Sequence, residues 1–315
     1  MVEANGVTSE AQSSPAYGVL SVVKPVGMTS HDVVDVVRRL VGTRRVGHTG
    51  TLDPGAAGVL VLAIGRGTRI VEFLAEAEKE YRVEVTFGRA TDTGDAYGET
   101  VHEATALHLD TRHVQSVLAQ FTGEIEQVPP MASAVHVQGR RLYEHARRGA
   151  VVDVPPRRVQ IFRLELVEFV RTSPPRAWLH VACSKGTYIR RLCHDIGDAL
   201  GCGAHASFMV RTRVGQHRID AAHTLEELAA HARAGRLADV LQPLDEAIGD
   251  LPAVELTPPL RRAVMHGHPL PLFKVAHWQR LIGARAVRLR DSGGLVALAR
   301  VEAGMLKPFK VLRDS

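Results

Sequence analysis

The amino-acid sequence predicts a mixed α/β or α+β main domain followed by a small β-rich domain. Up to about residue 250, strand-like apolar runs alternate with segments whose apolar residues recur at helical spacing. From about Pro252 the pattern changes to short apolar runs broken by proline and glycine, such as VRLRD, GGLVALARVE and PFKVL. Residues 1–16 offer almost nothing to bury. We therefore expect a disordered tail over 1–16, a main domain over 17–250 and a β-rich domain over 251–315.

The first ordered elements are expected to be a strand and a capped helix. The apolar run GVLSVVK predicts the strand, which ends at Pro25. Thr29 or Ser30 can then cap a helix that ends at Gly42. The apolar face of this helix consists of Val33, Val34, Val36, Val37 and Leu40.

The next segment predicts a loop and two strands. Glycine, threonine and proline favour a loop from Val46 to Gly58, and the continuous apolar run Val59–Ile64 is typical of a buried strand. The segment EYRVEVTFG alternates with a period of two, and the polar turn GRATDTGDAYGE closes it. The alternation places four residues on one face: Tyr81, Val83, Val85 and Phe87.

Later elements complete the main domain. A helix is expected near His113–Phe121 and a strand over Trp178–Cys183. A tight turn at 184–186 then leads into a helix from Thr187 onward, and the alanine-rich stretch from Thr224 to Pro243 is expected to be helical. The apolar stripe of the helix after Thr187 consists of Ile189, Leu192, Cys193, Ile196 and Leu200.

Composition restricts the functional class. The 315 residues carry 39 Lys and Arg against 34 Asp and Glu, and the net charge of +5 fits a polyanionic partner without requiring one. The three cysteines contain no CxxC pair, HExxH is absent, and no Cys/His cluster has zinc-ligand spacing. We therefore expect a reducing compartment and no metal site. Because the sequence has no signal-peptide pattern and no apolar run of about 18 residues, we expect a soluble, cytoplasmic protein.

The segment HTGTLDPG is the strongest local candidate for chemistry. Pro54 pushes Asp53 out of helical conformation, and the surrounding glycines let the backbone bend and approach another group closely. A carboxylate on such a loop is well placed to meet a substrate, although local sequence alone favours a turn aspartate that bonds to its own backbone. A dinucleotide fingerprint, a Walker lysine and a GxSxG elbow are all absent, so neither nucleotide-cofactor binding nor serine-hydrolase chemistry is expected.

Five segments in a fixed order resemble one enzyme family. The string GHTGTLDPGAAGVLVLAIGRGTR is similar to the signature of the TruB-type pseudouridine synthases, and VVKPVGMTSHDVV precedes it as in that family. The segments KEYRVEVTFGRATDTGDAYGE, VPPMASAVHVQGRRLYEHARRG and CSKGTYIRRLCHDIGDALGCGAH follow in the family's order. The resemblance covers about residues 18–218. Small residues at 55–57 and a looser match at 208–210 depart from the pattern and concern the shape of the pocket.

The resemblance implies a catalytic domain with a largely antiparallel central sheet crossed by an RNA cleft, and a PUA-like C-terminal module. It implies isomerisation of the uridine at position 55 in the T loop of tRNA, with the acceptor stem as a further contact. The N1–C1′ bond breaks and C5 joins C1′ without redox change, so the reaction needs a positioned carboxylate but no cofactor or metal. We expect a monomer that acts on tRNA without a membrane or an obligate protein partner.

The family pattern assigns three catalytic positions. Asp53 would be the essential carboxylate, and the sequence does not distinguish a nucleophile from a general base. Arg190, in GTYIR, would pair with Asp53, because an adjacent positive charge favours the anionic carboxylate; taken alone, Arg190 fits a surface helix arginine. Tyr81 would pack against the target uracil and can transfer a proton late in the reaction, although its alternation also allows a core role.

The resemblance also implies a set of RNA-binding residues. His48 would fill the space left by the flipped base, with an ordinary loop histidine as the alternative. Lys24 would support the pocket or else extend along the surface. Met209 would form an apolar wall, and Tyr188 would contact the RNA. Four arginines suit backbone phosphates, with a solvated helix face as the competing interpretation: Arg140, Arg141, Arg147 and Arg148.

Two other functional classes fit the same residues. An RNA chaperone with this fold would bind and fold tRNA without chemistry, so Asp53→Asn would leave its function intact. The catalytic subunit of an RNA-guided pseudouridylation complex shares the LDP-type motif but would be inactive on free tRNA. The absence of long basic tails in the sequence disfavours this last class.

Overall fold

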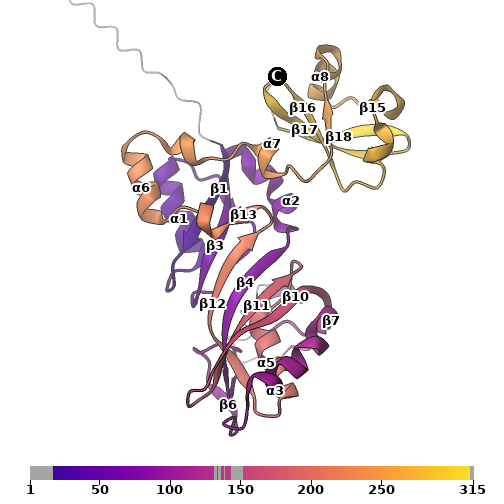
Figure 1. The fold of residues 1–315 in the computed structure, drawn as a ribbon. Helices are drawn as coiled ribbons and strands as arrows, with labels where there is room; N and C mark the ends of the chain where they lie inside the picture. The colour runs from indigo at the N-terminus through magenta and orange to yellow at the C-terminus, as the bar shows by residue number, and fades with distance from the viewer. Residues whose placement is uncertain (1–16, 131–132, 134–135, 138, 143–151, 313–315) are drawn as a thin grey trace, which may run out of the picture.

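Two β-sheets organise the computed structural model, which describes residues 17–312 except 131–132, 134–135, 138 and 143–151 (Figure 1). The larger sheet has nine strands and the smaller sheet has five. The smaller sheet is formed by the C-terminal residues, so the predicted mixed α/β fold with a small β-rich C-terminal part is confirmed. Within these described residues, no helix is both long and apolar enough to cross a membrane.

The larger sheet is antiparallel at all but one of its described pairings. Its strands run in the order β1 (Gly18–Lys24), β3 (Ala56–Ile64), β12 (Ala204–Val214), β4 (Lys79–Phe87), β11 (Arg176–Cys183), β10 (Arg157–Val170) and β7 (Gly123–Gln127), with β2 (Val46–His48) beside β3 and β13 (His217–Arg218) beside β12. The exception is the parallel pairing of β12 with β3, which places Arg211 opposite Gly58. The predicted largely antiparallel sheet is therefore confirmed.

Helices pack at both ends of the larger sheet. α1 (Ser30–Val41) and α6 (Leu225–Arg233) contact each other near β1, and α3 (Thr111–Leu118) and α5 (Ile189–Ala199) lie at the opposite end (Figure 1). The other helices among the described residues are α2 (Val71–Ala75), α7 (Leu244–Ala247) and α8 (Pro258–Met265). The 3₁₀ turns are η1 (Gly65–Ile70), η2 (Ala119–Phe121), η3 (Ile219–Ala221), η4 (Leu237–Val240), η5 (Leu272–Lys274) and η6 (Trp278–Leu281). Two short ribbons pair β5 (Arg89–Thr91) with β6 (Thr100–Glu103), and β8 (His136–Val137) with β9 (Arg140–Arg141).

The capping of α1 matches the sequence prediction. The Thr29 hydroxyl accepts a hydrogen bond from the Asp32 amide at 3.0 Å, and the Asp32 carboxylate accepts one from the Thr29 amide at 2.8 Å. Gly42 follows the helix with a φ of 67°, a left-handed conformation that glycine adopts without strain. These two ends fix where the chain leaves the helix for the loop that carries Asp53.

The alternation predicted for β4 is also confirmed. The side chains of Tyr81, Val83, Val85 and Phe87 are all buried in one core, which they share with the apolar stripe of α5. This core lies between the sheet and α3 and α5, so the face of β4 that carries Tyr81 is the face on which α5 packs.

Two element boundaries differ from the predictions. The loop predicted over 46–58 is shorter, because Val46–His48 pairs with β3 and β3 itself begins at Ala56, where it meets β12. The alanine-rich helix ends at Arg233 and does not continue to Pro243. Gly235 adopts a φ of 67°, and this left-handed turn separates α6 from η4.

The C-terminal sheet runs in the order β14 (Ala253–Glu255), β16 (Val287–Asp291), β17 (Gly294–Glu302), β18 (Met305–Val311) and β15 (Leu270–Pro271). Helix α8 within this region was not predicted, because its apolar residues are few and proline starts it. Apolar side chains of β17 and α7 share a core with β3 and α2, and Phe73 lies 6.2 Å from Phe309 between ring centroids. The proposed boundary at residue 250 falls in the link between α7 and β14.

Candidate active site

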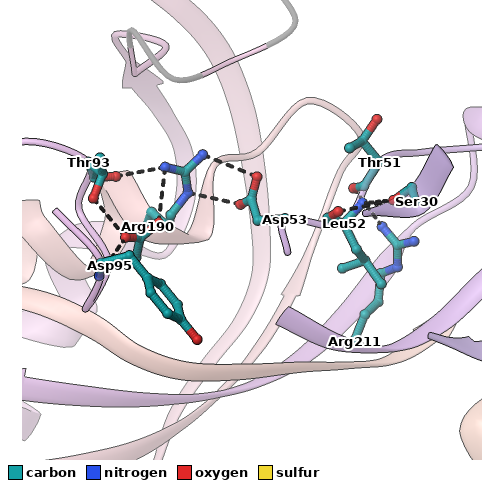
Figure 2. Close-up of polar contacts among 9 residues, drawn as sticks. Ser30, Thr51, Leu52, Asp53, Thr93, Asp95, Arg190 and Arg211 are labelled. Atoms are coloured by element: carbon teal, nitrogen blue, oxygen red, sulfur yellow. Dashed lines mark hydrogen bonds and ion pairs between the residues drawn. The ribbon is translucent and has the colours of Figure 1, made fainter. Parts of the chain in front are cut away.

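The loop that carries Asp53 is held at its backbone by α1. The Ser30 hydroxyl accepts a hydrogen bond from the Leu52 amide at 2.8 Å and donates one to the Leu52 carbonyl at 3.0 Å (Figure 2). The Pro54 carbonyl accepts a hydrogen bond from the Gly27 amide at 2.8 Å. Because both neighbours of Asp53 are bonded to other segments, the position of its carboxylate is determined by the fold rather than by the loop alone.

A buried arginine on β12 holds the same loop from the other side. The Arg211 guanidinium donates to the carbonyls of Val59 at 2.8 Å, Gly50 at 3.0 Å and Thr51 at 3.3 Å. The two strands approach so closely here that a Cβ on Gly58, whose φ is 109°, would lie 2.2 Å from the Arg211 carbonyl oxygen. Arg211 was not among the predicted site residues, yet it is the largest fully buried side chain described in the protein.

Asp53 and Arg190 form a two-point ion pair. Arg190 Nε lies 2.9 Å from Asp53 Oδ2, and Arg190 Nη2 donates to Asp53 Oδ1 at 3.3 Å (Figure 2). The remaining edge of the guanidinium donates to the Thr93 carbonyl at 2.7 Å and lies 3.4 Å from Asp95 Oδ2. The Arg190 side chain is buried, whereas that of Asp53 is 39% exposed. A planar arginine held on both sides therefore presents the carboxylate toward solvent-accessible space.

The start of α5 places Arg190. Tyr188 is the N-cap residue of this helix, and its side chain does not cap the helix. Instead, the buried Gln127 at the end of β7 accepts a hydrogen bond from the Tyr188 amide at 3.0 Å and donates one to the Tyr188 carbonyl at 3.3 Å. The Gln127 amide thus fixes the backbone two residues before Arg190.

The ion pair opens into a pocket of about 700 Å³. The three predicted catalytic residues line it: Asp53, Tyr81 and Arg190. Three of the predicted RNA-binding residues also line it, namely His48, Tyr188 and Met209, whereas Lys24 does not. Other lining residues come from α1, the Asp53 loop and β12, among them Ser30, Leu52 and Arg211. The volume falls in the range typical of small-molecule sites and is large enough for one nucleoside.

The pocket walls combine apolar and polar side chains. Met209 is buried opposite Ala56 and belongs to the same core as Tyr81. Burial raises the pKa of the Tyr81 phenol, so the phenol stays protonated at neutral pH. Burial lowers the pKa of His48, whose ring is therefore neutral near pH 7 and can stack without carrying a charge. Tyr188 lines the mouth beside Arg190.

Two buried lysines lie beside the pocket. Lys24 is fully buried rather than extended along the surface, and it donates to the carbonyls of Pro25 at 2.8 Å and Met28 at 2.6 Å. Lys79 donates to the carbonyls of Ala75 at 2.9 Å and Ala77 at 2.6 Å. Burial is the main cause that lowers the pKa of each ammonium group from 10.5 to about 8, and the Arg211 charge acts in the same direction.

From the lowered pKa values of these lysines, we predict that the free energy of unfolding increases as the pH rises above about 8. Between about pH 8 and 10.5 the unfolded lysine keeps the proton that the folded lysine has released, so the free energy of unfolding increases with pH. In urea titrations at about pH 7, 8 and 9, Lys79→Met should flatten this increase by up to about 1 kcal/mol per pH unit.

The exposed Lys274, in the C-terminal region, provides the control, because Lys274→Met should keep the wild-type slope. The slopes should be compared up to about pH 9 only. Burial raises the pKa of the Cys183 thiol from 9.0 to about 11, so above pH 9 this thiol lowers the free energy of unfolding while the lysines raise it. Equal slopes for wild type and Lys79→Met would contradict the prediction.

The remaining predicted residues are arginines whose side chains the structure does not describe. Arg140 and Arg141 form β9, but their side chains lie outside the described part of the chain, as do Arg147 and Arg148.

Among the described residues, His194, Asp195 and Asp198 on α5 bring potential metal-ligand atoms within 4.8 Å of one another. They do not line the pocket, and Asp195 is already paired with Arg191 at 2.7 Å.

Comparisons with known proteins show the family of the chain. Residues 38–189 match the family described as "TruB family pseudouridylate synthase (N terminal domain)", and residues 190–249 match the "tRNA pseudouridylate synthase B C-terminal domain". The "tRNA pseudouridine synthase B" of Pelotomaculum thermopropionicum is 49% identical over 93% of this chain and 92% of its own. That of Symbiobacterium thermophilum is 52% identical over 81% of this chain and 83% of its own.

Chains in two solved complexes have the same fold. The crystal structure of a Cbf5–Nop10–Gar1 complex contains a chain that is 26% identical and covers 94% of this chain and 85% of its own, with a TM-score of 0.70. A chain of an H/ACA RNP bound to a substrate RNA containing 2′-deoxyuridine is 25% identical, with a TM-score of 0.69 and the same coverage. Together with the motif order and the near-full-length relatives, these matches show that the chain belongs to the TruB family of pseudouridylate synthases.

Proposed function

We propose that the protein isomerises uridine to pseudouridine at position 55 in the T loop of tRNA. The observation that carries the proposal is the Asp53 carboxylate, held by two contacts with the buried Arg190 at the mouth of a pocket that also contains Tyr81. The relatives named tRNA pseudouridine synthase B support tRNA as the substrate. The C-terminal sheet would serve as the PUA-like module that contacts the acceptor stem.

The reaction requires the target base to leave the stack. Flipping a nucleotide costs a few kcal/mol, which is partly recovered when the uracil packs against Tyr81 and Met209 and when His48 fills the vacated space. In the pocket, Asp53 would act on the nucleoside either as a nucleophile or as a base while the N1–C1′ bond breaks. After the base rotates, C5 bonds to C1′, the C5 proton leaves, and N1 takes up a proton, so atoms and charge balance.

Arg190 would orient the carboxylate during these steps. Its guanidinium binds both Asp53 oxygens and is itself held by the Thr93 carbonyl, so the acid keeps one direction without help from the substrate. The Tyr81 phenol, which burial keeps protonated, can donate a proton late in the reaction. We propose that the protein performs this chemistry as a monomer in the cytoplasm, without a cofactor.

The decisive experiment incubates the purified protein with unmodified tRNA in the presence of a chelator and maps pseudouridine along the RNA. We expect a single product at position 55, and no product in a tRNA that carries cytidine there. Modification that appears only after guide RNA and partner proteins are added would assign the protein to the RNA-guided class. Accelerated tRNA folding without any product would assign it to the chaperone class.

A further inference from the structure

Tyr97 is a large aromatic side chain that stays 73% exposed close to the Asp53 loop. It lies in the turn between β5 and β6, and the predicted catalytic set does not include it. Single exposed apolar side chains are common and need no explanation by themselves. What distinguishes Tyr97 is that both its ring and its backbone are held in place.

The ring of Tyr97 rests on the glycine that follows Asp53 and Pro54. A Cβ placed on Gly55 would lie 2.3 Å from Tyr97 Cε2 and 3.1 Å from both Cδ2 and Cζ, so only glycine leaves room for the ring there. Gly55 is two residues from Asp53, which limits their Cα separation to about 7 Å. Stacked bases repeat at about 3.4 Å along a strand, so the point of contact between ring and loop lies within about two base steps of Asp53.

The backbone of Tyr97 is tied to the partner of Arg190. The Tyr97 amide donates to Asp95 Oδ1 at 3.0 Å, and the Thr93 hydroxyl donates to the same oxygen at 2.7 Å. The other oxygen of Asp95 lies 3.4 Å from Arg190 Nη1. One carboxylate therefore connects the turn that carries Tyr97 with the Asp53–Arg190 pair, so the Tyr97 backbone is tied to the pocket although its ring does not line it.

An ordered aromatic ring that remains open to solvent is suited to a flat partner. The nucleotides on either side of a flipped base lose a stacking neighbour, and unpaired RNA bases commonly stack on aromatic side chains. We propose that Tyr97 is a substrate-contacting residue whose exposed ring stacks on a nucleotide adjacent to the target uridine. The inference rests on the proposed function, because it requires an RNA substrate in the pocket beside Asp53.

The first test compares Tyr97→Ala and Tyr97→Phe in steady-state assays on unmodified tRNA. Loss of one base–aromatic stack should raise KM about tenfold for Tyr97→Ala and leave kcat near the wild-type value. Tyr97→Phe should match wild type, because stacking does not need the hydroxyl. Phe162→Ala, which removes another exposed aromatic side chain that does not line the pocket, should change neither constant.

The second test places the fluorescent base 2-aminopurine next to the target uridine, on one side or the other, and measures its fluorescence when the tRNA binds. Each protein compared, with Tyr, Ala or Phe at position 97, also carries Asp53→Asn. Stacking should quench the probe at one of the two positions, and Tyr97→Ala but not Tyr97→Phe should remove the quenching. An unchanged KM for Tyr97→Ala would overturn the proposal. If kcat and the melting temperature also fall, Tyr97 stabilises the Asp53 loop and does not contact the substrate. If the wild-type protein modifies no tRNA, the proposed function itself fails, and this outcome is visible before any Tyr97 variant is compared.

Discussion

Asp53→Asn is expected to abolish pseudouridine formation while leaving tRNA binding intact. Asparagine has nearly the same shape as aspartate but can act neither as a nucleophile nor as a base, so the rate should fall by about 10⁴-fold or more. Arg190 would keep its contacts with Asp95 and with the Thr93 carbonyl, so the pocket should stay assembled. Removal of a negative charge from an RNA-binding pocket should not weaken binding to a polyanion.

The measurement pairs pseudouridine mapping under single-turnover conditions with a tRNA-binding titration. Asp35→Asn is a suitable control, because Asp35 is also ion-paired, 2.9 Å from Arg38, but lies on α1 and does not line the pocket. It should change neither rate nor affinity. Retained modification in Asp53→Asn would refute the site, and lost binding would mean that the variant reports on folding rather than on chemistry.

Arg190→Lys is expected to reduce kcat by about 100-fold or more with a much smaller change in KM. Lysine keeps the charge but presents a single ammonium group, which cannot reproduce contacts to both oxygens of Asp53 and to Thr93. A catalytic group displaced by about 1 Å can lose two orders of magnitude in rate. The effect should therefore be on the catalytic step, since the base-contacting walls of the pocket do not change.

The neighbouring residue offers a matched control for this prediction. Arg191 lies on the same helix and pairs with Asp195 at 2.7 Å, but it does not line the pocket. Arg191→Lys should retain wild-type kcat and differ from Arg190→Lys although the two changes are chemically identical. Equal losses in both variants would indicate that α5 as a whole is disturbed, and an unaffected Arg190→Lys would remove Arg190 from the catalytic set.

The elements predicted from the sequence were those with strong local signals. Thr29, Asp32 and Gly42 define α1 through capping and a left-handed turn, which are properties of a few adjacent residues. The alternation in β4 likewise marks its buried face locally. The start of β3 at Ala56 was missed because it depends on pairing with β12, about 150 residues later in the chain.

The residues that hold the candidate site were harder to predict. Ser30 looked like a helix cap, but its hydroxyl bonds to the backbone of Leu52. Asp95 looked like one more polar residue in a turn, and only the fold brings it to Arg190. Arg211 lies two residues after the buried Met209 in continuous register against β4, opposite Tyr81, but charged side chains are rarely buried, so its type argued against an inward position. Family resemblance located Asp53, Tyr81 and Arg190, whereas their supports depend on contacts between distant segments.

The place of β12 between β3 and β4 has a consequence for how the protein is made. Both neighbours of β12 are complete by Phe87, whereas β12 itself ends at Val214. In a nascent chain, β3 can pair with β1 and β2, but the strand that joins β3 to β4 is missing until more than a hundred further residues have been translated. Only when Arg211 emerges can it bind the carbonyls of Gly50 and Thr51. Translation products that end before Arg211 consequently lack the contacts that complete this side of the pocket.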